Sequence, residues 1–490
     1  MDMSIFSILA LGGFLGLMAV LVRNRMAMCI AGFFTIFPLV YRAIDVTVLD
    51  VFGPFYTREL NQFVGGNFAG PVFIVSALAF VVPLMLLFPD RGRRFQKLAN
   101  LRPIYADYHR VAANGAFVSG LAVLGVLAVN FVLTGTVPIL QGIDRIAYAH
   151  SAGPIHSTVY ELNFLLNFLF GAFTVLPRIN GRGYDMRFAG LAAALAAYWV
   201  ITGNRFSVFF VLVSFYLMPA ALVLIARQAG RIGELDRHRI AQRILTSRAS
   251  RVMVALASVA MVSGLLYNSY YNVRDYRDPL HEIRERVLVQ PVQLWANSWE
   301  RVDFSDPADP INEYAVGEIL NPMDFERNST IQYLMTVELG YFRAAELTEL
   351  GQAYNGGYPE VHFELLGAYL PFLTMPLAGL IAAWFLSLFL GLLYRNLVLT
   401  SVLGLYVYFG LTLHFTGGMV TFLMTPTYWV KIALFLGCWA AESAIVARAA
   451  RCQASANAAQ AALARWHADA TRSTASRFGP QGAARPAETQ

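Results

Sequence analysis

Charged residues are scarce in this chain of 490 residues: they make up 14% of it, whereas hydrophobic residues make up 57%. Because a soluble domain carries about 25% charged residues, most of this surface is expected to face lipid rather than water. Cysteine is scarcer still. Cys29, Cys438 and Cys452 form neither a disulfide framework nor a metal-binding spacing, and we interpret them as small apolar side chains.

Several motifs that would indicate other chemistry are also missing. The sequence has no Gly-rich nucleotide loop, no His-x-x-x-His zinc spacing, and no calcium-loop pattern around Asp303, Asp306 and Asp309, where prolines intervene. The net charge of +6 does not indicate nucleic acid, because the basic residues are dispersed in short segments between apolar runs. We therefore expect no metal site, no cofactor and no nucleic-acid partner.

What the sequence has in abundance is long apolar runs. A membrane-spanning helix needs about 20 mostly apolar residues, and about eleven runs approach or reach that length. They begin near Ile5, Met26, Pro71, Val111, Thr158, Phe188, Ser207, Val252, Leu366, Leu397 and Trp429. We interpret the first run as a retained helix rather than a cleaved signal. The predicted fold class is all-α, a polytopic membrane protein.

The basic residues predict how these spans are oriented. Of the 37 lysines and arginines, 25 fall in every second segment between the predicted spans. Segments rich in lysine and arginine face the cytoplasm. The amino terminus is then periplasmic, the carboxyl terminus is cytoplasmic, and the expected location is the bacterial inner membrane.

These spans divide the chain into four parts. Residues 1–269 hold predicted spans one to eight, residues 270–365 form a large outer loop, residues 366–448 hold spans nine to eleven, and residues 449–490 form a tail. The loop has seven arginines, no lysine and 17 acidic residues, together with many aromatic ones. It is too apolar to be disordered, so we expect a small, mostly helical domain. The Ala-rich tail is expected to start helical and to be largely disordered.

Arginines at the outer ends of spans are candidate anion-binding groups. Arg205 lies in a turn of about five residues, Thr202 to Phe206, between two apolar runs. A permanent cation there needs an anion or water, and the planar guanidinium fits a phosphate. Arg145 could bind the same phosphate or pair with Asp144, and Arg42 at the outer end of the second span is a third candidate. The alternative for Arg205 is a side chain that reaches to the membrane interface.

A second cluster precedes the ninth span. Glu360 and Glu364 are four residues apart, so they share a helix face, with His362 roughly opposite. A histidine or carboxylate near the membrane surface could accept a proton from a sugar hydroxyl, which makes His362 and Glu360 candidate catalytic residues. Alternatively, Glu360 only compensates the helix dipole and His362 is a surface residue.

Taken in order, these segments resemble the oligosaccharide repeat-unit polymerases, the Wzy or O-antigen polymerase class. The resemblance is carried by Gly135 to Leu140 followed by Arg145, by Thr202 to Ser207 with Arg205, and by the outer loop ending in the Gly-rich segment Gly356 to Gly367. The resemblance extends over most of the chain, from roughly residue 110 to residue 420.

The resemblance implies a metal-independent glycosyltransferase that joins undecaprenyl-pyrophosphate-linked repeat units on the periplasmic face, with a chain-length regulator as a possible partner. Arg205, with Arg145 and Arg42, would bind the lipid pyrophosphate, and His362 or Glu360 would take the acceptor proton. Two alternatives stay open: an O-antigen ligase-like transferase, and a flippase for the same lipid-linked oligosaccharide.

Overall fold

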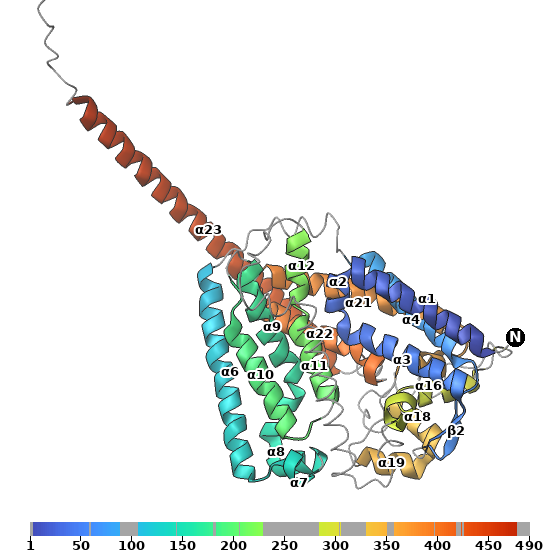
Figure 1. Cartoon of the computed structure of the whole chain (residues 1–490). Coiled ribbons are helices and arrows are strands. Elements are labelled where there is room, and N and C mark those ends of the chain that lie inside the picture. The colour runs from blue at the N-terminus through green and yellow to red at the C-terminus, as the bar shows by residue number, and fades with distance from the viewer. Residues whose placement is uncertain are drawn as a thin grey trace, which may run out of the picture. The chain divides into compact units, whose positions relative to one another are not determined.

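The protein is described by a computed structural model that covers residues 3–57, 60–88, 106–143, 145–179, 183–204, 206–228, 284–302, 304, 330–349, 357–395, 397–417, 423 and 426–477. It is mostly helical (Figure 1). Within the described residues, the strands are two short antiparallel ones, β1 (Phe55–Thr57) and β2 (Gln62–Val64). The chain divides into two compact units, Met1–Phe435 and Leu436–Gln490.

Six helical segments in the described part of the chain are long and apolar enough to cross a membrane. They are Ser4–Asn24, Ala69–Leu87, Val111–Gln141, Ser207–Arg227, Pro371–Tyr394 and Pro426–Ile445. A pair bent by 49°, Ala147–Glu161 with Asn163–Ile179, would make a seventh, and Met186–Ile201 and Val398–Leu413 are shorter apolar helices. These helices support an all-α polytopic membrane protein. The count of eleven spans stays a prediction, and its eighth member, near Val252, lies outside the described residues.

One group of helices is formed mainly by the first quarter of the chain. It comprises α1 (Met3–Asn24), α2 (Met26–Ala31), α3 (Phe33–Phe52), α4 (Ala69–Leu87) and the later helix α21 (Pro371–Tyr394). A Cβ atom at Gly379 of α21 would lie 2.6 Å from the carbonyl oxygen of Phe80 in α4. Glycine therefore allows these two backbones to approach closely, as small residues do between membrane helices.

A second group follows in the sequence. It comprises α6 (Ala106–Thr134), α7 (Pro138–Gln141), α8 (Arg145–Glu161), α9 (Asn163–Ile179), α10 (Met186–Ile201), α11 (Phe206–Leu217) and α12 (Ala220–Gln228). Arg187 at the start of α10 donates to Asn114 of α6 over 3.2 Å and lies over the ring of Phe117. The backbone amide of Asp185 donates to Thr174 of α9. These contacts gather the start of α6, the end of α9 and the start of α10 at one end of the bundle.

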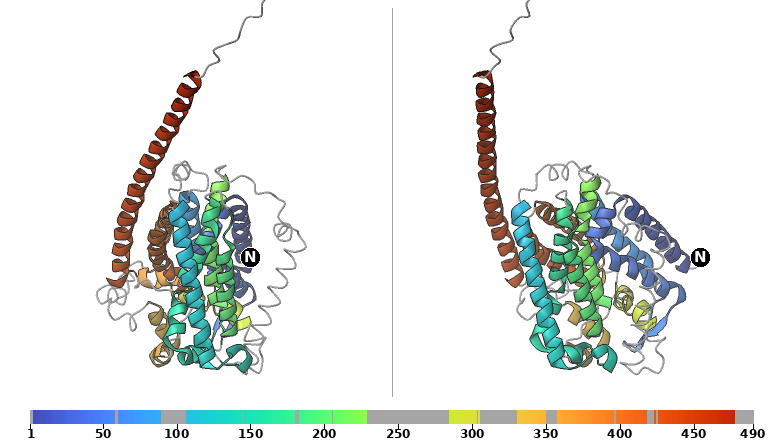
Figure 2. Two further views of the ribbon diagram at one scale, coloured as in Figure 1. Left: turned by 90° about the vertical axis from the view of Figure 1, so that its left-hand side faces the viewer. Right: turned by 60° about the vertical axis from the view of Figure 1, so that its left-hand side comes forward.

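The described part of the outer loop is mostly helical. Its helices are the π-helix η2 (Glu285–Val289), α16 (Gln293–Glu300), α18 (Thr330–Leu339), α19 (Tyr341–Glu349) and α20 (Glu360–Leu366). This agrees with the predicted helical loop in those segments. Figures 1 and 2 show α18 and α19, in yellow to light orange, at the same end of the first unit as α7 and the start of α8, in teal.

The chain continues as helix and strand beyond Arg42, which was predicted to lie at the outer end of the second span. Helix α3 continues to Phe52 because Ala43, Val46 and Leu49 extend its buried stripe. The carboxylate of Asp50 accepts hydrogen bonds from the amides of Ala69 and Gly70, which satisfies the start of α4. The strand pair β1–β2 lies between these two helices, so the second span does not end at Arg42 as predicted.

The carboxyl-terminal part also differs from the prediction. After α22 (Val398–Gly417), the helix α23 runs from Pro426 to Arg477. The predicted helical start of the tail is confirmed, and the helix continues through residues 449–477, further than the expectation of a largely disordered tail allowed. Alanine has the highest helix propensity of all residues, and this segment is Ala-rich.

Candidate functional site

The short turn between α10 and α11 adjoins the segment before α8. Helix α10 ends at Ile201 and α11 begins at Phe206, within one residue of the predicted turn, and Gly203 between them has φ +73°. A Cβ atom at Gly203 would lie 3.5 Å from the Cβ of Pro138 and 3.8 Å from the carbonyl oxygen of Ile143. Two segments that the sequence singled out separately therefore lie against each other. We call them together the turn site: residues 135–145 and 202–206.

Of the two arginines predicted for the turn site, the structure describes one. Arg145 is the first residue of α8 and is half-buried. Arg205 lies outside the described residues, as does Asp144, so the phosphate contact and the Asp144 pairing stay predictions. Asn204, immediately before Arg205, donates from its side chain to the hydroxyl of Thr202 over 3.1 Å.

The last turn of α10 is held by two buried hydrogen bonds to the preceding helices. The hydroxyl of Tyr198 lies 2.7 Å from Nδ1 of His156 in α8, and the indole of Trp199 donates to Oδ1 of Asn163 in α9 over 3.0 Å. Trp199 is fully buried and His156 is 2% exposed. The sequence analysis did not single out His156, because its partner Tyr198 lies 42 residues away. These contacts fix the direction in which the 202–206 turn leaves the helix.

Arg42 and Glu360 meet, but as partners of each other. Nη2 of Arg42 lies 2.9 Å from both carboxylate oxygens of Glu360, and the Arg42 and Glu360 side chains are 7% and 0% exposed. Nε of Arg42 donates to the carbonyl of Pro291, Nη1 donates to that of Tyr358, and the guanidinium lies over Phe73. A buried charge requires such a partner. In place of a phosphate ligand and a proton acceptor, the structure therefore has a buried tie between α3 and the outer loop.

His362 is also drawn into the packing beneath the loop. Its Nδ1 lies 3.1 Å from the hydroxyl of Thr374, and its ring packs edge-on against Tyr358. Burial lowers the pKa of His362 to about 4. Proton acceptors work best when their pKa lies near the working pH. In this conformation His362 is neutral at pH 7 and is a weak base for a sugar hydroxyl.

Further hydrogen bonds fasten the outer loop to α4 and to the strand β1. The indole of Trp295 donates to the carbonyl of Ala69, and the hydroxyl of Tyr358 donates to that of Ser76. Thr57 contacts Glu285 over 3.0 Å and Gln293 over 3.2 Å. The described parts of the loop thus rest on α3, α4 and β1.

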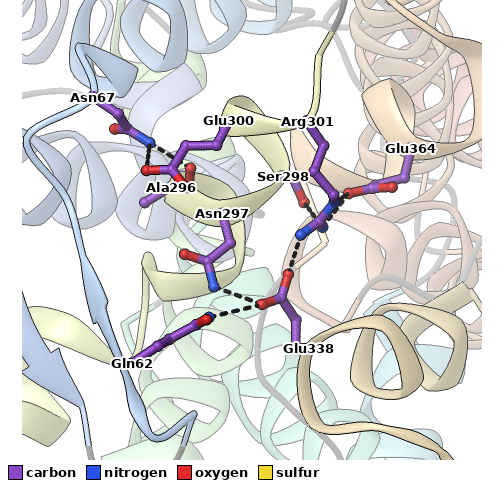
Figure 3. Close-up of polar contacts among 9 residues, drawn as sticks. All are labelled: Gln62, Asn67, Ala296, Asn297, Ser298, Glu300, Arg301, Glu338 and Glu364. Atoms are coloured by element: carbon purple, nitrogen blue, oxygen red, sulfur yellow. Dashed lines mark hydrogen bonds and ion pairs between the residues drawn. The ribbon is translucent and has the colours of Figure 1, made fainter.

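A polar cluster on the loop is centred on Arg301, just after α16 (Figure 3). Its guanidinium binds Glu338 of α18 at 2.6 Å and also Glu364 of α20, while Nη2 donates to Ser298. The other oxygen of Glu338 accepts from Asn297 at 2.5 Å and from Gln62 at 3.2 Å. The Arg301 side chain remains 35% exposed. Three loop helices and β2 are joined here, although sequence reasoning had noted only Glu364 among them.

Aromatic rings border this polar cluster. Trp299 and Phe304 have ring centroids 5.8 Å apart, and Phe304 and Tyr369 are 5.5 Å apart, both pairs edge-on. The hydroxyl of Tyr369 donates to the carbonyl of Phe304 over 2.8 Å. Phe304 and Tyr369 are 41% and 52% exposed. The result is an exposed surface that combines ring faces with carboxylate and guanidinium groups.

Within the described ranges, no group of three or more His, Cys, Asp or Glu side chains is arranged to hold a metal ion. Comparison with known families gives one match: a family of unknown function, DUF6418, is similar to residues 324–431. That stretch includes α20, α21 and α22. No curated protein and no solved structure matches the chain.

Proposed function

We propose that this protein is a glycosyltransferase that joins undecaprenyl-pyrophosphate-linked oligosaccharide repeat units on the periplasmic face of the bacterial inner membrane. The observation that supports it most is the contact of Gly203 with Pro138 and Ile143. It brings together the segment that begins α8 at Arg145 and the turn in which the sequence has Arg205. Two guanidinium groups near one another suit a diphosphate, because each can form paired hydrogen bonds to it.

The proposed reaction needs a positive site and a surface for sugars. A hydroxyl of the acceptor saccharide attacks the anomeric carbon of the donor, the bond from that carbon to the diphosphate oxygen breaks, and the lipid diphosphate leaves with the bonding electrons. The hydroxyl proton passes to a base or to water. Arg205 and Arg145 would stabilise the charge that grows on the diphosphate. Arg42, Glu360 and His362 are not assigned to this chemistry, since the first two form the buried tie and the third is a weak base.

The orientation is part of the same proposal. Eleven spans with a periplasmic amino terminus place the turn site and the outer loop on one side of the membrane, and α7, α18 and α19 share one end of the first unit (Figure 1). The bilayer and lipid-linked oligosaccharides are then the partners, with a chain-length regulator as a further one.

Deletion of the gene in its own host distinguishes this proposal from its alternatives. Loss of a polymerase leaves surface glycan of a single repeat unit on a gel. Loss of a ligase or of a flippase leaves no glycan on the outer carrier. We expect single units, and an unchanged polymer ladder would contradict the proposal.

Arg205→Ala, restored to the deletion strain, should abolish polymer while the protein still inserts. Arg205→Lys should retain little activity, since a point charge cannot replace the planar fork of a guanidinium. Arg343→Ala is the matched control, because that exposed arginine pairs with its neighbour Glu346 three residues on. Normal chain length in Arg205→Ala would remove this residue from the mechanism.

A further inference from the structure

Five residues of the outer loop and of the segment before α21 form a partly exposed surface outside the turn site, in which Trp299 and Glu364 are half-buried and the other three are exposed. They are Trp299, Arg301, Phe304, Glu364 and Tyr369, and we call this surface the loop face. Its rings form a chain from Trp299 through Phe304 to Tyr369, and Arg301 and Glu364 form an ion pair beside them.

The groups of the loop face match the chemistry of a saccharide. A pyranose ring presents C–H groups on its faces and hydroxyls around its edge. Half-exposed aromatic side chains bury such C–H faces, as amphipathic rings do at interfaces. Carboxylate and guanidinium groups form strong, directed hydrogen bonds with hydroxyls.

The loop face is also held in place before any ligand arrives. Glu338 accepts from Arg301 and is itself held by hydrogen bonds from Asn297 and Gln62 (Figure 3). The hydroxyl of Tyr369 donates to the backbone carbonyl of Phe304. Side chains that are already ordered lose little conformational entropy when they bind, which favours recognition of weakly binding ligands such as sugars.

The charge of the surface limits which sugars it can accept. The single guanidinium of Arg301 faces two carboxylates, those of Glu338 and Glu364. The residue directly before Arg301 is the exposed Glu300, which adds a third carboxylate. The local charge is therefore negative. A carboxylated sugar would be repelled here, whereas an uncharged or amino sugar would not.

The position of the loop face fits a saccharide attached to a lipid. Tyr369 is two residues before Pro371, where the apolar helix α21 begins. Tyrosine is common at the level of the membrane interface, and the neighbouring Leu370 and Leu373 are 47% and 70% exposed. The loop face thus lies at the border of a predicted span, within reach of a headgroup whose lipid stays in the bilayer.

We propose that the loop face binds the saccharide of the acceptor repeat unit, and that this saccharide is uncharged or carries amino groups. That the bound saccharide is the acceptor rests on the proposed function. The binding of the sugar and its charge preference do not depend on catalysis.

The test is saturation-transfer NMR on the full chain in lipid nanodiscs with three disaccharide probes. These are N,N′-diacetylchitobiose, which is uncharged, deacetylated chitobiose, which is cationic, and cellobiouronic acid, which is anionic. We expect transfer to the first two and at least a several-fold weaker signal for the third. Trp299→Ala and Glu364→Gln should each weaken transfer to the uncharged probe several-fold. Phe342→Ala is the matched control, since that ring is 88% exposed on α19, outside the loop face.

Each outcome decides the matter. No transfer to any probe, or equal transfer to the anionic one, would overturn the inference, as would an equal loss of signal in Phe342→Ala. Thermal unfolding of each variant shows whether a lost signal reflects a lost fold, and Trp299→Phe, which keeps a ring, should then retain part of the binding. If sugars bind but deletion of the gene leaves a normal polymer ladder, the proposed function fails while the binding site stands.

Discussion

Arg42 and Glu360 can be separated from the proposed chemistry by their effect on stability. Arg42→Gln should destabilise the protein by about 3–5 kcal/mol, because it leaves the Glu360 carboxylate buried without its cation. Thermal unfolding in detergent measures this change. Arg343→Gln, which breaks an exposed pair with Glu346, should change stability by less than about 1 kcal/mol. An Arg42→Gln protein of normal stability that makes no polymer would instead return Arg42 to the diphosphate site.

His362 predicts a pH dependence with a definite sign. Burial lowers the folded-state pKa from 6.5 to about 4, so the unfolded chain takes up a proton first as the pH falls. The contribution of this residue to stability is complete above pH 6.5 and is lost as the pH falls toward about 4. The melting temperature of the wild type should therefore fall more steeply over that interval than that of His362→Gln. Parallel curves for the two proteins would mean that the ring is not buried in the folded state.

At the scale of single elements, the hydrogen bonds at the end of α10 are expected to position the 202–206 turn. Tyr198→Phe removes the bond to His156 and should lower stability by about 1 kcal/mol, while shortening the surface polymer more than that loss explains. Tyr184→Phe, at a 42% exposed tyrosine before α10, is the control. Normal polymer length in a Tyr198→Phe protein of reduced stability would make the contact structural only.

The sequence predicts helices well where composition alone decides. A run of apolar residues in lipid must form a helix, since every backbone group needs a partner within the segment. Helices therefore begin in or close to ten of the eleven predicted runs, and the remaining one lies outside the described residues. The continuation of α3 past Arg42 was missed because a charge normally ends a span. Here the ion pair with Glu360 compensates that charge, and the partners are 318 residues apart.

The candidate sites were harder to predict, because they too depend on contacts between residues far apart in the sequence. Arg145 and the 202–206 turn could each be singled out by a local pattern, whereas the contact of Gly203 with Pro138 and Ile143 was not predicted. Arg301 and Glu338, in contrast, stand in ordinary helical contexts, and their meeting depends on how α16, α18 and α20 pack. Likewise, Glu360 and Glu364 share the spacing of a common face but reach different arginines, Arg42 and Arg301. Tertiary contacts, which spacing does not encode, decide which carboxylate stays near the surface.

At the scale of the whole molecule, the proposed function depends on the membrane topology, that is, on which side of the membrane each segment faces. The positive-inside rule places Cys452 in the cytoplasm and α19 in the periplasm. A membrane-impermeant maleimide applied to intact spheroplasts should therefore label Phe342→Cys, an 88% exposed position, and should leave Cys452 unlabelled until the cells are lysed. Cys29→Ser and Cys438→Ser remove the remaining thiols from the assay. Labelling of Cys452 alone would place the outer loop in the cytoplasm. The proposed reaction takes place on the periplasmic face, so the glycosyltransferase proposal would then fail together with the predicted orientation.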